Sequence, residues 1–433
     1  MTREKRTVPQ TAGEKAESMF ENKAFQERAI LFAITWGKEE ETQISLRELR
    51  ALAETAGAVT VTSLLQPREL PDPGTYLGRG KLEELREMTV LMDATTVICD
   101  DELSPAQMKN LEEELGCKVC DRTLLILDIF AGRARTSEGK IQVELAQLRY
   151  RQSRLAGLGK SLSRLGGGIG TRGPGEKKLE MDRRLIADRI SALKKELELV
   201  KRHRDVLRKG RLKSGRKTAA IVGYTNAGKS TLLNMLTDAG VLEEDALFAT
   251  LDPTTRALTL PGGSEVLLTD TVGFIRKLPH LLIDAFRSTL EEAALADILI
   301  HVVDASSPYA EQQMEIVYQT LRELGAEGKP VITLFNKQDL VTEEKHLHDF
   351  QADYAIPVSI RHREGLDRFL EILEKVVREG QILVERVLPY QNAGIIAQIR
   401  QTGQILEEEY LADGIRVRAY VPEDLYGRLQ EVD

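Results

Sequence analysis

A glycine-rich loop between an apolar segment and a helix-forming segment constrains this chain more than any other feature. Residues 219–231 read AAIVGYTNAGKST, in which Gly223 and Gly228 bracket the loop and Lys229 opens the expected helix. Glycines allow backbone N–H groups to surround phosphate oxygens at a helix N-terminus. The segment therefore predicts a P-loop in which Lys229 reaches the β- and γ-phosphates of a nucleotide and Ser230 ligates Mg²⁺.

Strand and helix signals alternate along the chain on both sides of this loop. Strands are expected at 28–36, 58–65, 95–100, 123–130, 218–223, 256–261, 265–270, 297–304, 330–337, 356–360, 383–390 and 414–421. Helices are expected at 45–57, 80–92 and 104–115, from 229 onward, and at 393–410. Strands separated by helices predict parallel sheets covered by helices, so the expected fold class is multidomain α/β with a doubly wound nucleotide domain.

Between residues 141 and 210 the hydrophobic periodicity changes to that of paired helices. The apolar positions on a 4-3 spacing are Ile141, Leu145, Leu148, Leu155, Leu162, Ile186, Ile190, Leu193, Leu197, Val200 and Leu207. This spacing on both sides of a glycine-rich link predicts an antiparallel helical hairpin. The link, RLGGGIGTRGPGE at 164–176, matches the G-x-G-x-x-G pattern. A dinucleotide-binding turn must follow a strand, however, and this one follows a helix. We therefore expect a thin tip loop at 166–175.

The hairpin carries the basic charge of an otherwise acidic chain. Residues 149–217 hold 22 Lys and Arg against 7 Asp and Glu, whereas the formal net charge of the whole chain is −8. Such asymmetry indicates a localised contact with a polyanion. The alternative is a solvated hairpin whose charges balance the acidic remainder. Aromatic residues are sparse on this arm, which favours recognition of folded RNA by its shape and phosphates over base stacking.

These patterns divide the chain into six segments. They are a polar tail (1–27), an N-terminal α/β domain (28–140), the basic hairpin (141–210), a linker (211–217), a nucleotide-binding or G domain (218–378) and a small C-terminal α/β domain (383–433). No apolar run approaches the roughly 18–20 residues that span a bilayer, and the polar N-terminus lacks the apolar stretch of a secretory signal. Cys99, Cys117 and Cys120 are expected in buried strands rather than in a redox or zinc site. We therefore expect the reduced environment of the cytoplasm, and we separately expect a monomer.

Two further motifs complete a guanine-nucleotide site. In DTVG (270–273), Asp270 would hold Mg²⁺ through water and the N–H of Gly273 would meet the γ-phosphate. In NKQD (336–339), the Asp339 carboxylate can accept hydrogen bonds from both N1–H and N2–H of guanine, and adenine offers no such pair of donors. The motifs therefore predict a site for GTP rather than ATP.

Residues near these motifs are expected to supply the remaining contacts. Asn336 and the stem of Lys337 would buttress the base, and Ser359 with Ile360 would add a backbone contact beside it. A threonine of the stretch LFATLDPTTR should complete the Mg²⁺ shell when the γ-phosphate is present. The candidates, which spacing alone does not separate, are Thr250, Thr254 and Thr255.

Two positions bear on the rate of hydrolysis. Many GTPases place a glutamine directly after the glycine of DTVG to orient the attacking water, and Phe274 has no polar atom for this role. We therefore expect slow hydrolysis until a partner orders the site or donates a polar group, unless another side chain positions the water. Asn226 stands where some GTPases ligate K⁺, and the alternative is an asparagine that merely favours the turn.

Together these stretches resemble the HflX family, ribosome-associated GTPases of the Obg–HflX group. The resemblance covers nearly the whole chain and is carried by DRTLLILDIFAGRARTSEGKIQVELAQLRY (121–150), GGIGTRGPGE (167–176), GYTNAGKS, FATLDPTTR, DTVGF and NKQD. It implies binding to the large (50S) ribosomal subunit, splitting or rescue of stalled or idle 70S ribosomes under stress, and Thr250 as the threonine that joins Ser230 on Mg²⁺. The alternatives are a ribosome-assembly GTPase acting on immature large subunits, and a non-ribosomal GTP switch whose hairpin binds a protein.

The expected site residues follow from the motifs and from this resemblance. The catalytic set is Lys229, Thr250 and Gly273, and the metal set is Ser230 and Thr250 as direct Mg²⁺ ligands, Asp270 through water and Asn226 for K⁺. The GTP- or GDP-binding set is Gly223, Tyr224, Thr225, Asn226, Ala227, Gly228, Lys229, Ser230, Thr231, Phe248, Ala249, Thr250, Leu251, Asp252, Asp270, Thr271, Val272, Gly273, Asn336, Lys337, Gln338, Asp339, Ser359, Ile360 and Arg361. The rRNA-binding set is Arg149, Arg151, Arg154, Lys160, Arg164, Gly166, Gly167, Gly168, Gly170, Arg172 and Gly173.

Overall fold

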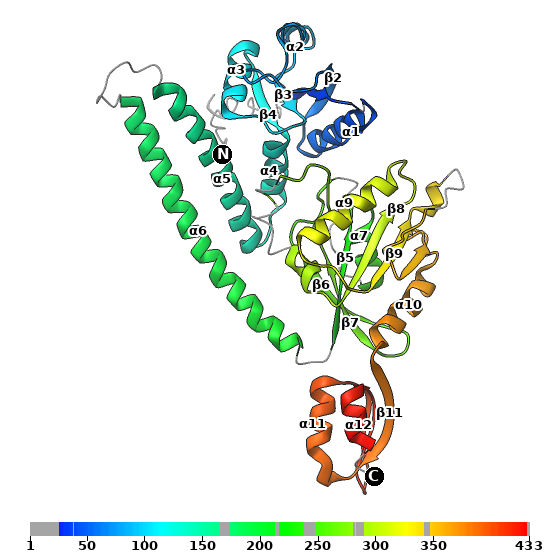
Figure 1. Ribbon diagram of the computed structural model, residues 1–433. Helices are drawn as coiled ribbons and strands as arrows, with labels where there is room; N and C mark the ends of the chain where they lie inside the picture. The colour runs from blue at the N-terminus through cyan, green and yellow to red at the C-terminus, as the bar shows by residue number, and fades with distance from the viewer. Residues whose placement is uncertain are drawn as a thin grey trace, which may run out of the picture.

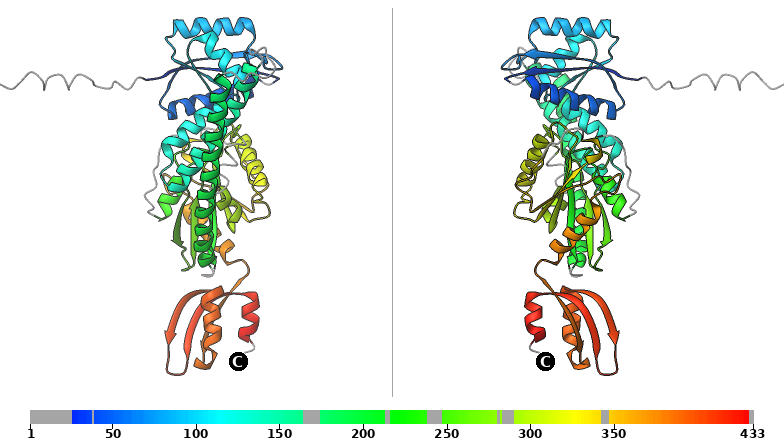
Figure 2. Two further views of the ribbon diagram at one scale, coloured as in Figure 1. Left: turned by 90° about the vertical axis from the view of Figure 1, so that its left-hand side faces the viewer. Right: turned by 90° about the vertical axis from the view of Figure 1, so that its right-hand side faces the viewer.

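A computed structural model describes most of the chain. The described residues are 26–37, 39–163, 174–212, 216–237, 247–279, 282, 290–341 and 347–430, and they form three sheets. An N-terminal domain and a helical hairpin lie beside the G domain, and the C-terminal domain lies at the opposite end of the G domain from the N-terminal domain (Figures 1 and 2). This arrangement confirms the predicted multidomain α/β fold class. In the part of the chain that the structure describes, no helix combines the length and apolarity needed to cross a membrane.

The N-terminal domain is built on a four-stranded parallel sheet. Its strands, in the order β2-β1-β3-β4, are β1 (Arg28–Thr35), β2 (Val59–Pro67), β3 (Thr96–Cys99) and β4 (Lys118–Asp121). Its covering helices are α1 (Glu39–Thr55), α2 (Arg79–Leu91) and α3 (Pro105–Leu115). Cys99 and Cys120 are buried in β3 and β4 as predicted, and Cys117 lies half-buried just ahead of β4.

The predicted strand at 123–130 is wrong, because these residues form helix α4 (Arg122–Arg133). The Asp121 carboxylate caps the helix by accepting a hydrogen bond from the N–H of Leu124, 2.9 Å away. Most side chains of α4 are buried, including Leu127 and Phe130. A helix enclosed on nearly every face has a continuous apolar sequence, which periodicity does not distinguish from a buried strand.

The predicted helical hairpin is confirmed as α5 (Ser137–Ser163) and α6 (Pro174–Leu212). Ile141 and Leu145 of α5 form a buried cluster with Ile190 and Leu193 of α6, on the predicted 4-3 seam. The Arg189 guanidinium also donates to the Glu144 carboxylate across the pair, with an Nε–O distance of 2.7 Å. At 1.5 Å of rise per residue, the 39 residues of α6 extend over roughly 60 Å. Figure 1 shows α6 running past the N-terminal domain and along the G domain.

The G domain has a six-stranded sheet in the order β10-β9-β8-β5-β7-β6. Its strands are β5 (Lys217–Gly223), β6 (Thr254–Thr259), β7 (Glu265–Asp270), β8 (Ile298–Asp304), β9 (Val331–Asn336) and β10 (Tyr354–Pro357). Only β6 runs antiparallel to its neighbour within this sheet. Its helices include α7 (Lys229–Thr237), α9 (Ala310–Glu323) and α10 (Leu366–Arg378). The carboxyl ends of β5, β7 and β9 carry the three predicted nucleotide motifs.

The N-terminal domain and the G domain share one hydrophobic core. Leu49 of α1 and Phe130 of α4 belong to the same buried cluster as Tyr224, which follows β5, and Phe274, which follows β7. A continuous core of this kind resists separation of the two domains, because separation would expose apolar side chains on both. The N-terminal domain therefore packs directly against the face of the G domain where the nucleotide motifs lie.

The C-terminal domain is an antiparallel sheet in the order β11-β13-β12, formed by β11 (Gln381–Leu388), β12 (Gln404–Tyr410) and β13 (Ile415–Pro422), with helices α11 (Ala393–Thr402) and α12 (Glu423–Gln430). The predicted helix at 393–410 is correct only in its first half, since α11 ends at Thr402. The segment QILEEEY pairs with β13 instead, and Glu409 forms a cross-strand ion pair with Arg416. Cross-strand pairing of this kind is not visible in the helix-like composition of the segment.

We predict that acid destabilises the G domain through Asp349. Its Oδ2 accepts hydrogen bonds from Tyr318 at 2.7 Å and Thr333 at 2.6 Å, and His301 Nδ1 lies 3.6 Å away. Burial opposes ionisation, but the neighbouring His301 ring and the hydrogen bonds from Thr333 and Tyr318 lower the pKa of Asp349 from 3.8 to about 2. Because the folded pKa is the lower one, the carboxylate stabilises the fold above about pH 4 by about 2 kcal/mol, and this is lost as the pH falls towards 2.

The variant Asp349→Asn tests this prediction by urea unfolding at several pH values. Its free energy of unfolding should lie about 2 kcal/mol below that of the unsubstituted protein at neutral pH. The difference should shrink as the pH falls from about 5 to about 2. A difference that stays constant over this range would contradict the prediction.

Candidate nucleotide site

The loop between β5 and α7 has the backbone of a phosphate-binding loop. Gly223 has a φ of +150°, and a Cβ there would overlap the carbonyl oxygen of Val302. Gly228 has a φ of +103°, and a Cβ there would overlap Nδ2 of Asn336. Both positions therefore require glycine, which lets the loop turn tightly and places its N–H groups at the start of α7.

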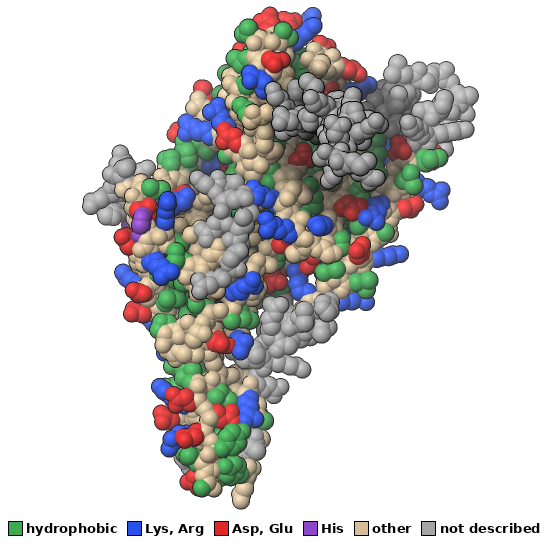
Figure 3. All heavy atoms as spheres, turned by 180° about the vertical axis from the view of Figure 1, so that it is seen from behind, with side chains coloured by type: hydrophobic (Ala, Val, Ile, Leu, Met, Phe, Trp, Pro, Cys, Tyr) green, Lys and Arg blue, Asp and Glu red, His purple; other side chains and the backbone are tan. Residues whose placement is uncertain are grey.

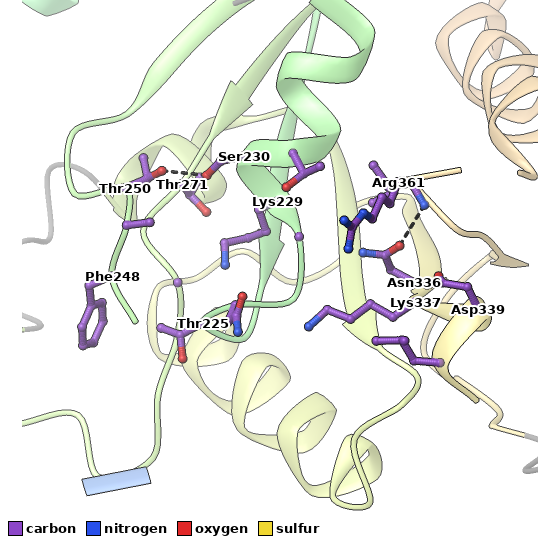
Figure 4. A pocket seen from close by; sticks show the side chains of 17 residues that line it. Thr225, Lys229, Ser230, Phe248, Thr250, Thr271, Asn336, Lys337, Asp339 and Arg361 are labelled. Atoms are coloured by element: carbon purple, nitrogen blue, oxygen red, sulfur yellow. Dashed lines mark hydrogen bonds between the residues drawn. The ribbon is translucent and has the colours of Figure 1, made fainter. Parts of the chain in front are cut away.

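The Lys229 side chain is buried within this loop. Its Nζ donates a hydrogen bond to the carbonyl oxygen of Tyr224 at 2.7 Å. Burial lowers the pKa of Lys229 to about 8, and the neighbouring Asp270 carboxylate acts in the opposite direction. Gly273 lies against Lys229 and Thr225, so that any side chain at 273 would meet both. The ammonium group is thereby kept at the open end of the loop, where a nucleotide's terminal phosphates would lie (Figure 4).

Three side-chain oxygens meet at the start of α7. The hydroxyl of Ser230 donates to Asp270 Oδ2 at 2.7 Å and lies 2.7 Å from the hydroxyl of Thr250. Asp270 Oδ1 is buried without a hydrogen-bond partner among the described residues, and burial raises the pKa of this carboxyl group. A buried carboxylate oxygen beside two hydroxyl groups is the hard oxygen environment that Mg²⁺ prefers. The residues fit a magnesium ion, which would neutralise phosphate charge and polarise the phosphoryl group.

The structure distinguishes among the three candidate threonines. Only Thr250 reaches Ser230, whereas Thr254 and Thr255 lie in β6. The Thr255 hydroxyl is 2.9 Å from that of Thr269 and so belongs to the sheet. Spacing in the sequence does not distinguish the metal-site threonine from the other two, because all three carry the same hydroxyl group.

The NKQD motif forms the other end of the site. Asn336 donates to the carbonyl oxygen of Ala227 at 2.9 Å and accepts from the N–H of Ile360 at 3.0 Å, which ties the P-loop to the loop after β10. The hydroxyl of Ser359 donates to Asp339 Oδ1 at 2.7 Å. This hydrogen bond holds the pKa of Asp339 below its usual range. The carboxylate is thus ionised and oriented, as bonding to guanine N1–H and N2–H requires.

A cavity of about 530 Å³ connects the two ends. Its lining is Thr225, Asn226, Gly228, Lys229, Ser230, Thr231, Phe248, Ala249, Thr250, Thr271, Gly273, Asn336, Lys337, Asp339, Leu340, Ile360 and Arg361. Figure 4 shows Lys229, Ser230 and Thr250 on one side and Lys337 and Asp339 on the other. Leu340 is the one lining residue that the sequence prediction missed, although its place directly after the NKQD motif was a usable signal.

Several predicted nucleotide-binding residues do not line this cavity. They are Gly223, Tyr224, Ala227, Leu251, Asp252, Asp270, Val272, Gln338 and Ser359. Ala227 and Ser359 support the site through the hydrogen bonds described above, and Gln338 donates to the carbonyl oxygen of Phe335 at 3.2 Å. Leu251 and Val272 are buried in the core that the two domains share.

Phe274 is fully enclosed in the shared core. Its backbone is held by two hydrogen bonds. The N–H of Phe274 donates to the carbonyl oxygen of Gly223 at 3.1 Å, and the carbonyl oxygen of Phe274 accepts from the N–H of Thr225 at 2.8 Å. The ring is only 1% exposed and packs with residues of both domains. The position after the DTVG glycine therefore contributes packing and no polar group.

A buried polar cluster joins the N-terminal domain to the residues after Phe274. We call Glu48, Asp100, Arg122, Tyr224 and Lys277 the Arg122 cluster. The Arg122 guanidinium donates to Glu48 and, at 2.8 Å, to Asp100, while Tyr224 donates its hydroxyl to Glu48. Lys277 Nζ lies 2.6 Å from Asp100. Burial raises the pKa of Glu48, whereas Arg122 and Lys277 hold the pKa of Asp100 below its usual range.

Sequence reasoning missed this cluster because its members are widely separated and belong to no shared motif. Arg122 also donates to the backbone carbonyl oxygen of Arg276 at 3.2 Å, so that the N-terminal domain contacts the segment after DTVGF directly. Arg122 was not a candidate site residue in the sequence. Its position directly before the predicted strand at 123–130 offered no signal of such a role.

The predicted RNA-binding residues are only partly described. Arg149 and Arg151 lie on α5, with Arg151 exposed. Arg154 instead faces the N-terminal domain, where it donates to Asp121 at 2.6 Å and stacks over the Tyr150 ring at 4.1 Å. Lys160 lies in α5, but its side chain is outside the described part. Arg164, Gly166, Gly167, Gly168, Gly170, Arg172 and Gly173 lie outside the described residues.

The fold and the site together define a P-loop GTPase. Family models match in chain order: "GTP-binding GTPase N-terminal" at residues 43–131, "GTP-binding GTPase Middle Region" at 133–211 and "50S ribosome-binding GTPase" at 218–337. A GTPase HflX of Lacrimispora saccharolytica is 60% identical over 95% of this chain and 98% of its own length, and one of Caldanaerobacter subterraneus is 49% identical over 94% and 93%. The chain belongs to the HflX family of GTPases.

A solved structure is also similar. It is that of a GTP-binding protein from Sulfolobus solfataricus in complex with GDP, 26% identical, with a TM-score of 0.44 over 82% of this chain and 99% of that one.

Proposed function

We propose that this GTPase binds the large (50S) ribosomal subunit in its GTP state and splits or rescues stalled or idle 70S ribosomes, particularly under stress. The hairpin inserts into rRNA, and GTP hydrolysis releases the protein. Such a partner would place the chain in the cytoplasm, where it acts as a monomer. The observation that carries the proposal is the basic hairpin, an arm of two long helices attached to the G domain.

The size and charge of the hairpin support this role. Its second helix alone has 39 residues, and residues 149–217 carry an excess of 15 positive charges within an acidic chain. Elsewhere on the face seen in Figure 3, basic and acidic side chains are interspersed. Contacts with rRNA phosphates require such a local excess, because each neutralised phosphate releases counterions. The match to the model described as "50S ribosome-binding GTPase" supports the same partner.

Arg149 and Arg151 are the described residues that we propose for rRNA contact. Arg154 is held by Asp121 and Tyr150 and has a structural role, so we leave it out of this surface. Lys160, Arg164, Arg172 and the tip-loop glycines remain proposed contacts from the sequence alone.

The site supports the proposal that hydrolysis is slow in the isolated protein. Phe274 brings no polar atom to the position that commonly orients the attacking water, and its burial keeps it from moving readily into the cavity. Mg²⁺ would be held by Ser230 and Thr250 directly and by Asp270 through water. We also propose K⁺ at Asn226, whose φ of +61° fits a tight turn equally well.

We predict that purified large subunits accelerate GTP turnover at least tenfold, since an ordering partner would have to supply the missing polar group. The measurement is phosphate release with increasing concentrations of large subunits, in KCl and in NaCl. Equal turnover with and without subunits would contradict the proposal, and equal rates in the two salts would exclude a catalytic K⁺.

Two double variants that remove the same charge test the hairpin in the same titration with large subunits, in which the concentration needed for half-maximal stimulation reports binding. Arg149→Gln with Arg151→Gln should weaken subunit binding and reduce its salt dependence. Lys194→Gln with Lys195→Gln removes the same charge from exposed positions of α6 farther from the tip and should have a smaller effect. Equal effects of the two pairs would indicate a general charge effect instead of a specific contact.

A further inference from the structure

The loop that carries Thr250 is attached to the N-terminal domain on both sides of that residue. Two residues before it, the Phe248 ring packs edge-on against Phe130 of α4, with ring centroids 4.7 Å apart. Two residues after it, the Asp252 carboxylate contacts the chain between α4 and α5. Thr250 itself lies 2.7 Å from Ser230 at the metal site. The loop is therefore fixed at both ends to a different domain from the one that holds the rest of the nucleotide site.

The Asp252 contact is a hydrogen-bonded dock at the start of the hairpin. Asp252 Oδ2 accepts from the N–H groups of Arg135 and Thr136, each at 2.9 Å, and Oδ1 accepts from the Thr136 hydroxyl. Thr136 in turn accepts from the N–H of Gly139 at 3.0 Å and so caps α5. A carboxylate at a helix N-terminus is stabilised by the N–H groups there and by the helix dipole.

The Phe248 contact accounts for an unusual backbone conformation. Its φ of +56° lies in the left-handed region, which a bulky residue adopts only where its surroundings compensate. The ring is 2% exposed and lies in the core shared by the two domains. Its burial against Phe130 supplies that compensation.

We propose that the corner between α4 and α5 docks the Thr250 loop and holds the Thr250 hydroxyl at the Mg²⁺ site. Asp252 and Phe248 are positioning residues in this scheme, acting through Thr250. Because coupling between two sites is reciprocal, the nucleotide that draws Thr250 onto the metal also stabilises the start of α5. The stability of the start of α5, where the hairpin begins, therefore depends on whether GTP or GDP is bound, and the Asp252 carboxylate makes this connection. The inference requires only the GTPase activity and no ribosome.

Gly139→Ala tests the dock from the hairpin side. A Cβ at Gly139 would overlap Asp252 Oδ1, whereas Gly139 lies outside the nucleotide cavity. Alanine favours the helix over glycine, so α5 itself is not weakened. We expect affinity for a fluorescent non-hydrolysable GTP analogue with Mg²⁺ to fall by about tenfold, while affinity for the matching GDP analogue stays within about twofold.

Gly132→Ala is the matched control. It makes the same change in the neighbouring helix α4, at a position where a Cβ has no neighbour within 4 Å. Its affinities for both analogues should be unchanged. In an Asp252→Gly background the Gly139→Ala substitution should have no further effect, because the overlapping carboxylate is gone. Equal affinities of the Gly139→Ala and Gly132→Ala variants, or an equal loss for both nucleotides, would overturn the proposal.

Hydrogen exchange measures the reciprocal effect. In the unsubstituted protein, the amides of residues 136–141 should exchange several-fold more slowly with Mg²⁺ and the GTP analogue than with GDP. Asp252→Ala should abolish this difference while leaving exchange in the core strands of the G domain unchanged. Protection that persists in Asp252→Ala would overturn the proposal. Neither experiment involves ribosomes, so their outcome is independent of the proposed function.

Discussion

Asp339→Asn is expected to weaken GTP binding by about a hundred- to ten-thousand-fold and to create affinity for xanthosine triphosphate. The carboxylate offers two acceptors, which match guanine N1–H and N2–H. An asparagine offers one acceptor and one donor, which match N1–H and the 2-carbonyl oxygen of xanthine. The hydrogen bond from N2–H is replaced by a contact between two donors, and the one from N1–H loses its charge assistance; charge-assisted hydrogen bonds of about 1.5–3 kcal/mol each account for a loss of this size.

Binding of fluorescent GDP and its displacement by guanosine and xanthosine nucleotides would measure the change. Ser359→Ala is the control, because it removes only the hydroxyl that orients Asp339 Oδ1 at 2.7 Å. It should weaken GTP binding by no more than about tenfold and should create no affinity for xanthosine nucleotides. If Asp339→Asn retained its preference for GTP, base recognition by this carboxylate would be refuted.

The nucleotide site was predictable because its chemistry is carried by short motifs at the ends of strands. The P-loop, DTVG and NKQD each keep a fixed local spacing, and parallel strands bring their carboxyl ends to one edge of the sheet. The prediction therefore placed Lys229, Ser230, Asp270 and Asp339 without any knowledge of the tertiary structure.

The errors in secondary structure have a different physical origin. Residues 123–130 form a helix whose burial on nearly every side removes the amphipathic signal. Residues 404–410 form a strand because β13 pairs with them, and nothing in their own composition reports that partner. In both segments tertiary contacts decide between two conformations that the local sequence permits.

The contacts between domains could not be predicted from the sequence for the same reason. Asp252 meets Thr136 across 116 positions, and Arg122 meets the carbonyl oxygen of Arg276 across 154. No periodicity links residues so far apart. The sequence predicts Asp252, which lies two residues after Thr250, as a nucleotide-binding residue. In the structure its carboxylate faces the start of α5.

The largest effect on stability is expected from Arg122→Met, about 3–5 kcal/mol. Arg122 is 1% exposed, and its removal would leave the buried carboxylate of Glu48 without its ion-pair partner and Asp100 with Lys277 as its remaining partner. A buried charge that loses its partner costs more than a surface ion pair contributes. Arg189→Met is the control, since its pair with Glu144 is half-exposed and should cost less than about 1 kcal/mol.

Urea unfolding followed by circular dichroism measures this loss of stability. The fluorescence of the single tryptophan, Trp36, shows which part of the protein unfolds first. Trp36, whose side chain is 74% exposed, borders a cavity with Ser45 and Lys277, where the N-terminal domain meets the segment after DTVGF. Because Arg122 joins both sides of that boundary, Arg122→Met should alter tryptophan fluorescence at lower urea concentrations than it alters helix content. The unsubstituted domains share a core and should unfold together, so the two signals should coincide. A loss no larger than that of Arg189→Met, with coincident signals in both variants, would mean that apolar packing alone holds the N-terminal domain against the nucleotide site.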